Sequence, residues 1–379
     1  MRVAILGAGP AGLTLAYLLK RARPDLTIDV YEQNPPDATF GFGLAFSERA
    51  LEFLRGEDSD IWAAMQPSLE RWSDSILHLN GEEIRIDGMG YAGIGRLRLL
   101  EILRARANSV GIEPAYRRPI SSLDELGEAD LIVGADGMNS LVRNRVGFGA
   151  SIEYFTNRFA WYGTTKRFEA LGHTFIETPQ GVFNAHHHRH APEMSTFVVE
   201  VDEPTFRRCG FDTMNQAQAQ TLCERVFADT LGGAPLISNK SIWRQFPKIE
   251  NARWSCGNHV LIGDALHTAH FSIGSGTRLA MEDAIALCRA LESHGADIPA
   301  ALAAYKQDRK PLVTKLTAAA NASADWYEHF TKAMQLPPLD FAMSYITRSG
   351  RVDAKRLRVT SPEFMAAYEA HRPREMRPR

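Results

Sequence analysis

The chain has 379 residues, of which 45% are hydrophobic and 23% charged, an ordinary composition for a globular protein with a sizeable core. Its formal net charge of -2 argues against nucleic acid or an anionic membrane as a main partner, and no apolar stretch reaches the roughly 18 residues of a membrane span. The four cysteines show no paired spacing, so we expect a cytoplasmic protein without a disulfide framework or a metal site.

The first predicted elements form a βαβ unit. Residues 2–6 are a short apolar run that predicts a strand, a helical pattern follows over residues 13–19, and residues 28–32 predict the next strand. Because glycines interrupt the apolar start, we do not interpret it as a signal peptide. Units of this kind build parallel sheets, so a Rossmann-like fold is expected here.

The turn between this strand and helix carries a GxGxxG motif. Its first glycine allows a tight turn, the second lets the backbone approach a pyrophosphate, and the third packs helix against strand. Free N–H groups at the helix N-terminus then face the phosphates. At the end of the next strand, a glutamate can accept hydrogen bonds from a ribose. The predicted dinucleotide-binding residues, which do not separate FAD from NAD, are Gly7, Gly9, Pro10, Ala11, Gly12 and Glu32.

A second GxGxxG motif spans residues 88–93 and has Glu113 at the distance expected of a ribose-binding carboxylate. Its loop continues through Gly95 instead of opening a helix on the motif. We therefore interpret it as a flexible crossing between domains and not as a separate NADH-binding fold. An amphipathic helix is predicted directly afterwards, over residues 97–107.

Two further motifs each place an aspartate just after a buried strand. Residues 134–143 read GADGMNSLVR and match the DG motif, with its carboxylate at Asp136. Residues 263–267 read GDALH and match the GD motif, with its carboxylate at Asp264. Such a carboxylate can meet ribose or ribityl hydroxyls, or it can cap a helix. The order GxGxxG, DG, GD is specific for FAD-binding proteins.

Between the DG and GD motifs the pattern changes from alternating strands and helices to consecutive strands, which predicts an antiparallel sheet. These strands are expected at residues 159–165, 174–177, 181–187 and 195–201, with a helix at 215–230. We expect an α/β fold, a Rossmann-like FAD-binding domain with an inserted antiparallel-sheet substrate domain and C-terminal helices. The predicted domains are FAD-binding at 1–72, 92–150 and 255–320, substrate-binding at 73–91 and 151–254, and a C-terminal helical segment with a frayed tail at 321–379.

In its three motifs the chain resembles the group A flavoprotein aromatic hydroxylases, the para-hydroxybenzoate hydroxylase-like superfamily, over about residues 1–320. The resemblance implies that Asp264 contacts the ribityl chain, that Asp136 lies near the pyrophosphate, and that Arg96, in an RxxLxxxL pattern, approaches FAD. The loop after the GD motif reads FSIGSGTR where the family has PxxGQGxN. Its retained glycines, which place the flavin, are Gly274 and Gly276.

The resemblance also implies a reaction. NADH or NADPH reduces FAD, O2 adds to form a C4a-hydroperoxide, and oxygen is transferred to an electron-rich aromatic ring. The segments around Trp161, His186, His270 and the C-terminal Arg348 are similar to salicylyl-CoA 5-hydroxylase, 2-aminobenzoyl-CoA monooxygenase and the tryptophan hydroxylase of violacein biosynthesis. We expect salicylyl-CoA to be converted to gentisyl-CoA. The alternatives are 2-aminobenzoyl-CoA or tryptophan as substrate, a flavin dehydrogenase or reductase of the same fold, and a non-catalytic flavin-bound partner subunit.

The ring must lie in an apolar pocket that excludes water. We expect Trp161, Phe197 and Phe271 to line it, and we expect His270, His186 and Tyr162 to act in catalysis. Each of these residues can equally be an ordinary core side chain. His267 is expected to order the GD loop.

The run of histidines at residues 186–190 makes a poor metal site, because neighbours on a strand point to opposite faces. We expect no metal. Phosphates of a CoA thioester would need basic residues at the rim of the pocket. The candidates for phosphate binding are Arg117, Arg118, Arg143, Arg145, Arg158, Lys166 and Arg167.

For the assembly we expect a monomer or a homodimer.

Overall fold

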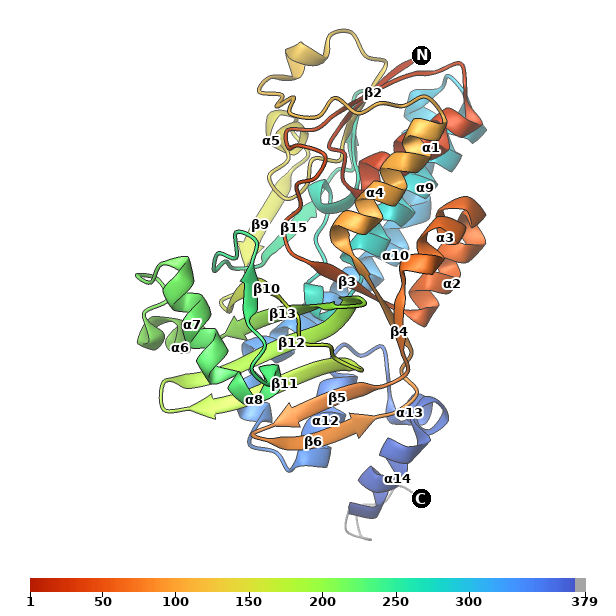
Figure 1. The fold of residues 1–379 in the computed structure, drawn as a ribbon. Coiled ribbons are helices and arrows are strands. Elements are labelled where there is room, and N and C mark those ends of the chain that lie inside the picture. Colours follow the sequence, from red (N-terminus) through yellow and green to blue (C-terminus); the bar gives the residue numbers. More distant parts are fainter. Residues whose placement is uncertain (372–379) are drawn as a thin grey trace.

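The computed structural model describes residues 1–371 and contains two main sheets with helices around them (Figure 1). The first is parallel in three of its four pairings, and only its edge strand β16 runs antiparallel. Its inner strand β1 is buried on both faces, as its continuous apolar sequence predicts. In spatial order the strands are β16 (Ser255–Cys256), β17 (His259–Leu261), β8 (Leu131–Gly134), β1 (Arg2–Leu6) and β2 (Thr27–Tyr31).

Four helices run side by side next to this sheet (Figure 1). Helix α1 packs against both α4 and α9, and α9 packs against α10. The predicted βαβ unit and the amphipathic helix after residue 95 are therefore confirmed. The helices are α1 (Pro10–Ala22), α4 (Arg96–Ser109), α9 (Gly276–His294) and α10 (Ile298–Glu328).

The second sheet has seven strands, and all its pairings are antiparallel except that of β11 with β5. The expected series of antiparallel strands is thus confirmed, and two strands from earlier in the chain extend it. In spatial order they are β14 (Leu236–Ser238), β10 (Arg158–Thr164), β13 (Met194–Val201), β12 (Gly181–Ala191), β11 (Leu171–Thr178), β5 (Ser75–Leu79) and β6 (Glu82–Ile86).

Each face of this sheet has its own cover. One face carries a buried aromatic cluster with the helices α6 (Glu203–Cys209), α7 (Gln216–Val226) and α8 (Ala228–Leu231). On the other face, the strands β5, β6 and β11 pack against C-terminal helices. These helices are α11 (Phe330–Ala333), α12 (Pro338–Thr347), α13 (Ala354–Thr360) and α14 (Pro362–His371).

Smaller elements join the two halves. A three-stranded sheet consists of β3 (Gly43–Ser47), β7 (Tyr91–Gly95) and β4 (Glu70–Trp72), and a two-stranded one of β15 (Pro247–Asn251) and β9 (Ala150–Tyr154). The second GxGxxG motif leads into β7 and opens no nucleotide-binding helix. A Cβ at Gly93 would lie 2.3 Å from the Arg189 carbonyl oxygen, so this glycine permits close strand packing. The remaining helices are α2 (Glu48–Glu57), α3 (Ser59–Met65) and α5 (Leu141–Arg145).

Two expected boundaries differ from the structure. The helix predicted at residues 215–230 is two helices, because α7 ends before Phe227 and α8 ends at the left-handed Gly232. Helix α10 continues through residue 320, so the expected end of the FAD-binding domain lies inside a helix. The rest of the domain division remains a proposal. The predicted frayed tail, residues 373–379, lies outside the described residues.

Candidate active site

One continuous cavity of about 1180 Å³ extends from the carboxyl end of β1 to a face of the seven-stranded sheet. One end is lined by the GxGxxG turn and the DG loop, and the middle by the loop that precedes α9. The opposite end is lined by aromatic side chains and histidines of β10 and β12 and by the segment after α12. Ligands in open parallel sheets bind at the carboxyl ends of the strands, so this is the expected position for a dinucleotide.

The GxGxxG turn fits a pyrophosphate. Gly7 has a φ of +103°, and a Cβ there would lie 2.2 Å from the carbonyl oxygen of Ala135. A Cβ at Gly12 would lie 1.9 Å from the carbonyl oxygen of Gly7, whereas one at Gly9 would meet nothing within 4 Å. Helix α1 begins at Pro10 without a side-chain cap, and Ala11 also lines the cavity. The turn thus leaves both space and free N–H groups for phosphate oxygens.

Glu32 lines the same end of the cavity and also shapes its own loop. Its Oε2 accepts a hydrogen bond from the Ala8 N–H at 3.0 Å. Its Oε1 accepts hydrogen bonds from the N–H and the side-chain amide of Asn34, both at 2.8 Å. A carboxylate oxygen accepts more than one hydrogen bond, so ribose hydroxyls can still bind here.

Asp136 holds the start of a helix, one of the two roles that its motif allows, and its second oxygen is available for the other. Its Oδ2 accepts a hydrogen bond from the Leu141 N–H at the start of α5, at 2.6 Å. Its Oδ1 is buried and has no partner among the residues that the structure describes. Burial raises the pKa of this carboxyl, while hydrogen bonds from the loop oppose the rise. A hydrogen-bond donor of a bound cofactor would satisfy Oδ1.

Asp264 and Arg96 both line the middle of the cavity, although they come from distant parts of the chain. Burial raises the pKa of Asp264, and the nearby guanidinium of Arg96 opposes this rise. Burial also lowers the pKa of Arg96, while Asp264 favours its charged form. The structure therefore brings together two opposite charges where the family resemblance places the flavin.

A buried carboxylate that the sequence analysis missed holds the GD loop. Asp283 of α9 accepts hydrogen bonds from the Gly263 N–H at 3.0 Å and from His267 Nε2 at 2.8 Å. Arg309 of α10 pairs with the same carboxylate at 3.0 Å. Burial raises the pKa of Asp283, but His267 and Arg309 lower that pKa by more, so the carboxyl group stays ionised. His267 thus orders the loop, as predicted.

The N-terminus of α9 opens into the cavity. Gly274 has a φ of +58°, and a Cβ there would lie 2.8 Å from the Ala45 carbonyl oxygen. The helix begins at Gly276 and lacks a side-chain cap from Ser275, so its first N–H groups and positive dipole end stay available. Arg278, which replaces the asparagine of the family pattern, pairs with Glu282 instead of entering the site.

The aromatic end of the cavity is the candidate chamber for a substrate ring. Trp161 and Phe271 both line it, with their ring centroids 6.2 Å apart. His186, His188 and Val198 complete the same wall. Two predicted ring contacts and one predicted catalytic histidine therefore lie together.

Tyr162 and Phe197 are corrections to the predicted site. They pair across β10 and β13, next to the pair of Trp161 and Val198 that lines the cavity. Because side chains alternate along a strand, both rings point to the opposite face, where they are buried against α7 and α8. Burial also raises the pKa of the Tyr162 hydroxyl. Neither residue reaches the chamber.

His270 is also placed differently from the prediction. It is absent from the cavity wall and lies behind Phe271, with ring centroids 4.2 Å apart, and its Nδ1 lies 2.9 Å from Ser272 Oγ. Burial lowers its pKa to about 4, so the ring is neutral at ordinary pH. In this position it packs behind the aromatic wall and does not line the cavity.

His186 is held by a buried chain of hydrogen bonds that the sequence did not reveal. Its Nε2 lies 3.2 Å from Glu200 Oε2, and the two side chains are 9% and 2% exposed. Glu200 Oε1 accepts a hydrogen bond from the Asn157 side-chain amide at 2.9 Å. The Asn157 N–H donates in turn to Glu328 at 2.8 Å. Burial lowers the pKa of His186, and Glu200 partly offsets this.

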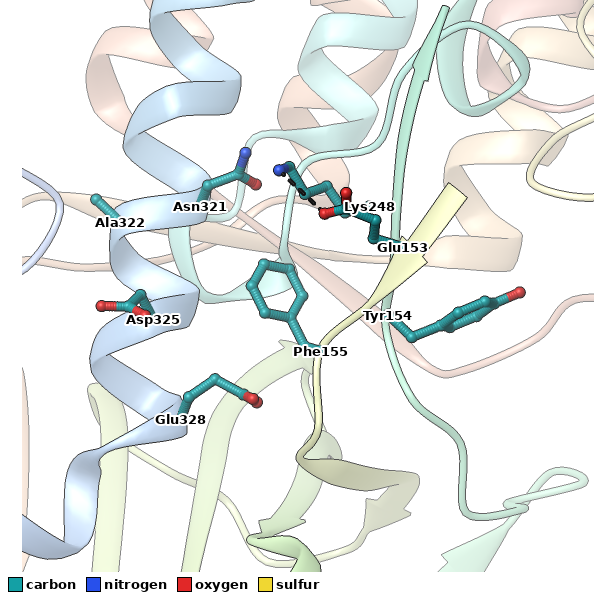
Figure 2. Close-up of a pocket in the computed structure, with 8 residues that line it drawn as sticks. All are labelled: Glu153, Tyr154, Phe155, Lys248, Asn321, Ala322, Asp325 and Glu328. Carbon is teal, nitrogen blue, oxygen red and sulfur yellow. Dashed lines mark hydrogen bonds and ion pairs between the residues drawn. The ribbon is translucent and has the colours of Figure 1, made fainter. Parts of the chain in front are cut away.

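Glu328, the last residue of this hydrogen-bond series, lies in a second hollow, between β9 and α10 (Figure 2). There the Glu328 side chain extends from α10 into the hollow, and Lys248 pairs with Glu153 at 3.5 Å. Glu328 also accepts two hydrogen bonds from Thr156. Glu328 thus anchors the outer end of the hydrogen-bond series that leads to His186.

Among residues 1–371, no group of three or more His, Cys, Asp or Glu side chains is arranged to hold a metal ion. No helix in this part of the chain is long and apolar enough to cross a membrane.

Comparison with known proteins gives the family. The family model described as an FAD binding domain matches residues 96–320, and a Rossmann-like NAD(P)-binding model matches residues 5–49. The chain belongs to the FAD-binding monooxygenase family. It is an FAD-dependent aromatic hydroxylase that uses NAD(P)H and O2, which sets aside the dehydrogenase and non-catalytic alternatives.

Three relatives align over almost the whole chain. A salicyloyl-CoA 5-hydroxylase from Streptomyces sp is 38% identical, over 92% of this chain and 70% of its own. A 3-hydroxy-4-methyl-anthranilyl-[aryl-carrier protein] 5-monooxygenase from Streptosporangium sibiricum is 34% identical, over 94% and 97%. A protodeoxyviolaceinate monooxygenase from Chromobacterium violaceum is 31% identical, over 92% and 94%.

Among solved structures, 2-methyl-3-hydroxypyridine-5-carboxylic acid oxygenase has the same fold, with a TM-score of 0.71 and 19% identity. The match covers 92% of this chain and 95% of the oxygenase.

Proposed function

We propose that this flavoprotein hydroxylates an aromatic acyl thioester, most specifically salicyloyl-CoA at position 5 to give gentisyl-CoA. Two relatives are named for thioesters of 2-substituted benzoic acids, and both names specify position 5. That carbon is para to the 2-hydroxyl or 2-amino group, which donates electrons to it. The thioester withdraws electrons, so the activating group is needed for attack by an electrophilic oxygen.

The observation that carries the proposal is that one continuous cavity joins the expected flavin region to a chamber lined by aromatic side chains. Bound FAD supplies the oxygen-activating chemistry after reduction by NAD(P)H. In the chamber, Trp161 and Phe271 would hold the ring in place and exclude water. The N-terminus of α9 would offer N–H groups to the flavin, and Asp264 would accept hydrogen bonds from its ribityl hydroxyls.

His186 is our candidate for the acceptor of the phenol proton. Glu200 can only accept hydrogen bonds when ionised, so the bond between them requires the proton to be on His186 Nε2. In the neutral ring Nδ1 then has a free lone pair. As the substrate hydroxyl loses its proton to Nδ1, the aromatic ring of the substrate becomes more electron-rich. Glu200 then stabilises the imidazolium of His186. This role replaces the ones expected for Tyr162 and His270.

The experiment is a panel assay of NADH-dependent O2 consumption with product analysis. The potential substrates are salicyloyl-CoA, 2-aminobenzoyl-CoA, free salicylate and tryptophan. We expect salicyloyl-CoA to give the fastest coupled turnover. Equal rates with free salicylate would rule out thioester recognition, and product from tryptophan alone would favour an indole substrate. Cytoplasmic location and a monomeric or homodimeric state remain predictions from the sequence.

A further inference from the structure

The cavity is also lined by the segment after α12, and because one of its lining residues, Arg356, is exposed, we call this part of the cavity its mouth. Apolar side chains line the mouth, among them Met89, Ile346 and Val352. Arg348, Arg351 and Arg356 stand on the same wall within nine positions of one another. The mouth therefore combines apolar side chains with clustered positive charge, and none of the three FAD motifs contributes these arginines.

The arginine at the inner end has a structural role. Arg348 donates hydrogen bonds to the Ser272 carbonyl oxygen at 2.9 Å and to Ser323 Oγ at 3.0 Å, and it lies 3.9 Å from the centroid of the Tyr345 ring. These contacts fix its guanidinium beside the flavin loop, so it contributes a positive charge to the wall without being free to follow a ligand.

The arginine at the outer end is different. The Arg356 side chain is exposed, lines the cavity, and makes no hydrogen bond or ion pair with the residues that the structure describes. Arg358, two positions later on the same short helix, pairs with Glu369 at 2.8 Å and does not line the cavity. Of the acidic residues at this mouth, Glu48 is already paired with Arg71 at 2.6 Å, while Glu52 has no ion pair among the described residues.

We propose that this mouth binds the phosphate-bearing arm of the thioester substrate, with Arg356 facing the phosphate and Arg351 adding positive charge to the same lining. This inference rests on the proposed function. With the aryl group in the chamber, the pantetheine chain would follow the apolar side chains of the mouth, and the phosphate that ends it would reach the arginines. A guanidinium binds phosphate through two parallel hydrogen bonds, which makes arginine well suited to this position. None of the basic residues expected from the sequence for this role is among these three.

The test compares two variants on three substrates. Arg356→Gln removes the charge at an exposed site, and Arg358→Gln is the matched control on the same helix. The substrates are salicyloyl-CoA, salicyloyl-phosphopantetheine and salicyloyl-pantetheine, the last of which lacks phosphate. We expect Arg356→Gln to raise KM for the two phosphorylated thioesters about fivefold, with kcat and the KM of salicyloyl-pantetheine unchanged. Arg358→Gln should leave kcat and the KM values for all three substrates unchanged.

The arms also separate the possible sources of the phosphate. An effect on both phosphorylated substrates would assign the pantetheine phosphate, which CoA and carrier-bound arms share. An effect on salicyloyl-CoA alone would assign the nucleotide phosphates. If Arg356→Gln changes all three KM values equally, or none of them, phosphate recognition at this mouth is wrong although the proposed function stands. If the wild-type protein hydroxylates no thioester, the proposed function fails and this inference fails with it.

Discussion

Asp264 and Glu32 lie at opposite ends of the expected flavin site, and each carboxylate faces the cavity from a different motif. We predict that Asp264→Ala and Glu32→Ala each weaken FAD binding about tenfold, because each removes hydrogen-bond acceptors for cofactor hydroxyls. The measurement is FAD affinity of the reconstituted apoprotein by flavin fluorescence. Asp25→Ala, at an exposed site paired with Arg23, is the control. Unchanged affinity in both variants would refute the motif assignment.

The His186–Glu200 pair predicts a specific pH dependence. Burial lowers the pKa of His186, so the ring stays neutral and active at pH values where a free histidine would be protonated. Glu200 raises that pKa, so Glu200→Gln should move the acid limb of the kcat profile to lower pH. It should also reduce kcat about tenfold or more, because the imidazolium loses its partner.

The control for this profile is Glu203→Gln, which removes a carboxylate at the surface that pairs with Arg207. It should retain the wild-type profile. A Glu200→Gln enzyme with full kcat and an unshifted acid limb would show that His186 accepts no proton in turnover.

At the scale of elements, α9 and α10 are joined by a buried charge network that also holds the GD loop. Arg309 pairs with Asp283 and with Glu282, both at 3.0 Å. Without Arg309, Asp283 keeps only His267 and the Gly263 N–H among the described residues, and Glu282 keeps only Arg278. We therefore predict that Arg309→Met lowers the free energy of unfolding by about 3 kcal/mol and weakens FAD retention. Chemical denaturation of the FAD-bound protein measures the first effect. Lys310→Met, at an exposed neighbouring position, should change neither the free energy of unfolding nor FAD retention.

Strand β12 explains which parts of the site the sequence could predict. Alternation along a strand was sufficient to separate His186 from His187, and His187 does lie on the opposite face, stacked on Phe168. The same rule separates Trp161 from Tyr162, but it does not say which of them faces the chamber. Only the cover provided by α7 and α8 decides that, and it depends on packing between distant segments.

The hydrogen-bond partners of His186 and of the GD loop could not be predicted either, because they too depend on packing between distant segments. Glu200 and Asn157 look like ordinary residues of a strand and a turn until folding brings them to His186. Asp283 looks like a polar residue of an amphipathic helix. The FAD motifs, by contrast, are local patterns in which neighbouring residues set the backbone geometry, and Gly7, Asp136 and Asp264 line one cavity. Their binding of FAD stays a prediction.

At the scale of the whole molecule, three separate parts of the chain together form the walls of the cavity. The Rossmann-like sheet forms the dinucleotide end, the seven-stranded sheet forms the chamber, and the C-terminal helices close the remaining wall. This arrangement accounts for why the relatives align over nearly the whole length of the chain. Hydroxylation then requires all three parts, since the ring must be held against the flavin with water excluded.

The most direct test of this account is to follow isotopically labelled O2 into the product. The purified FAD-bound protein is supplied with NADH, salicyloyl-CoA and labelled O2, and the product is examined by mass spectrometry and NMR. We predict one labelled oxygen atom per product molecule, on the ring carbon para to the original hydroxyl, in step with NADH oxidation. NADH oxidation that yields only hydrogen peroxide, or a product whose new oxygen comes from water, would contradict the account.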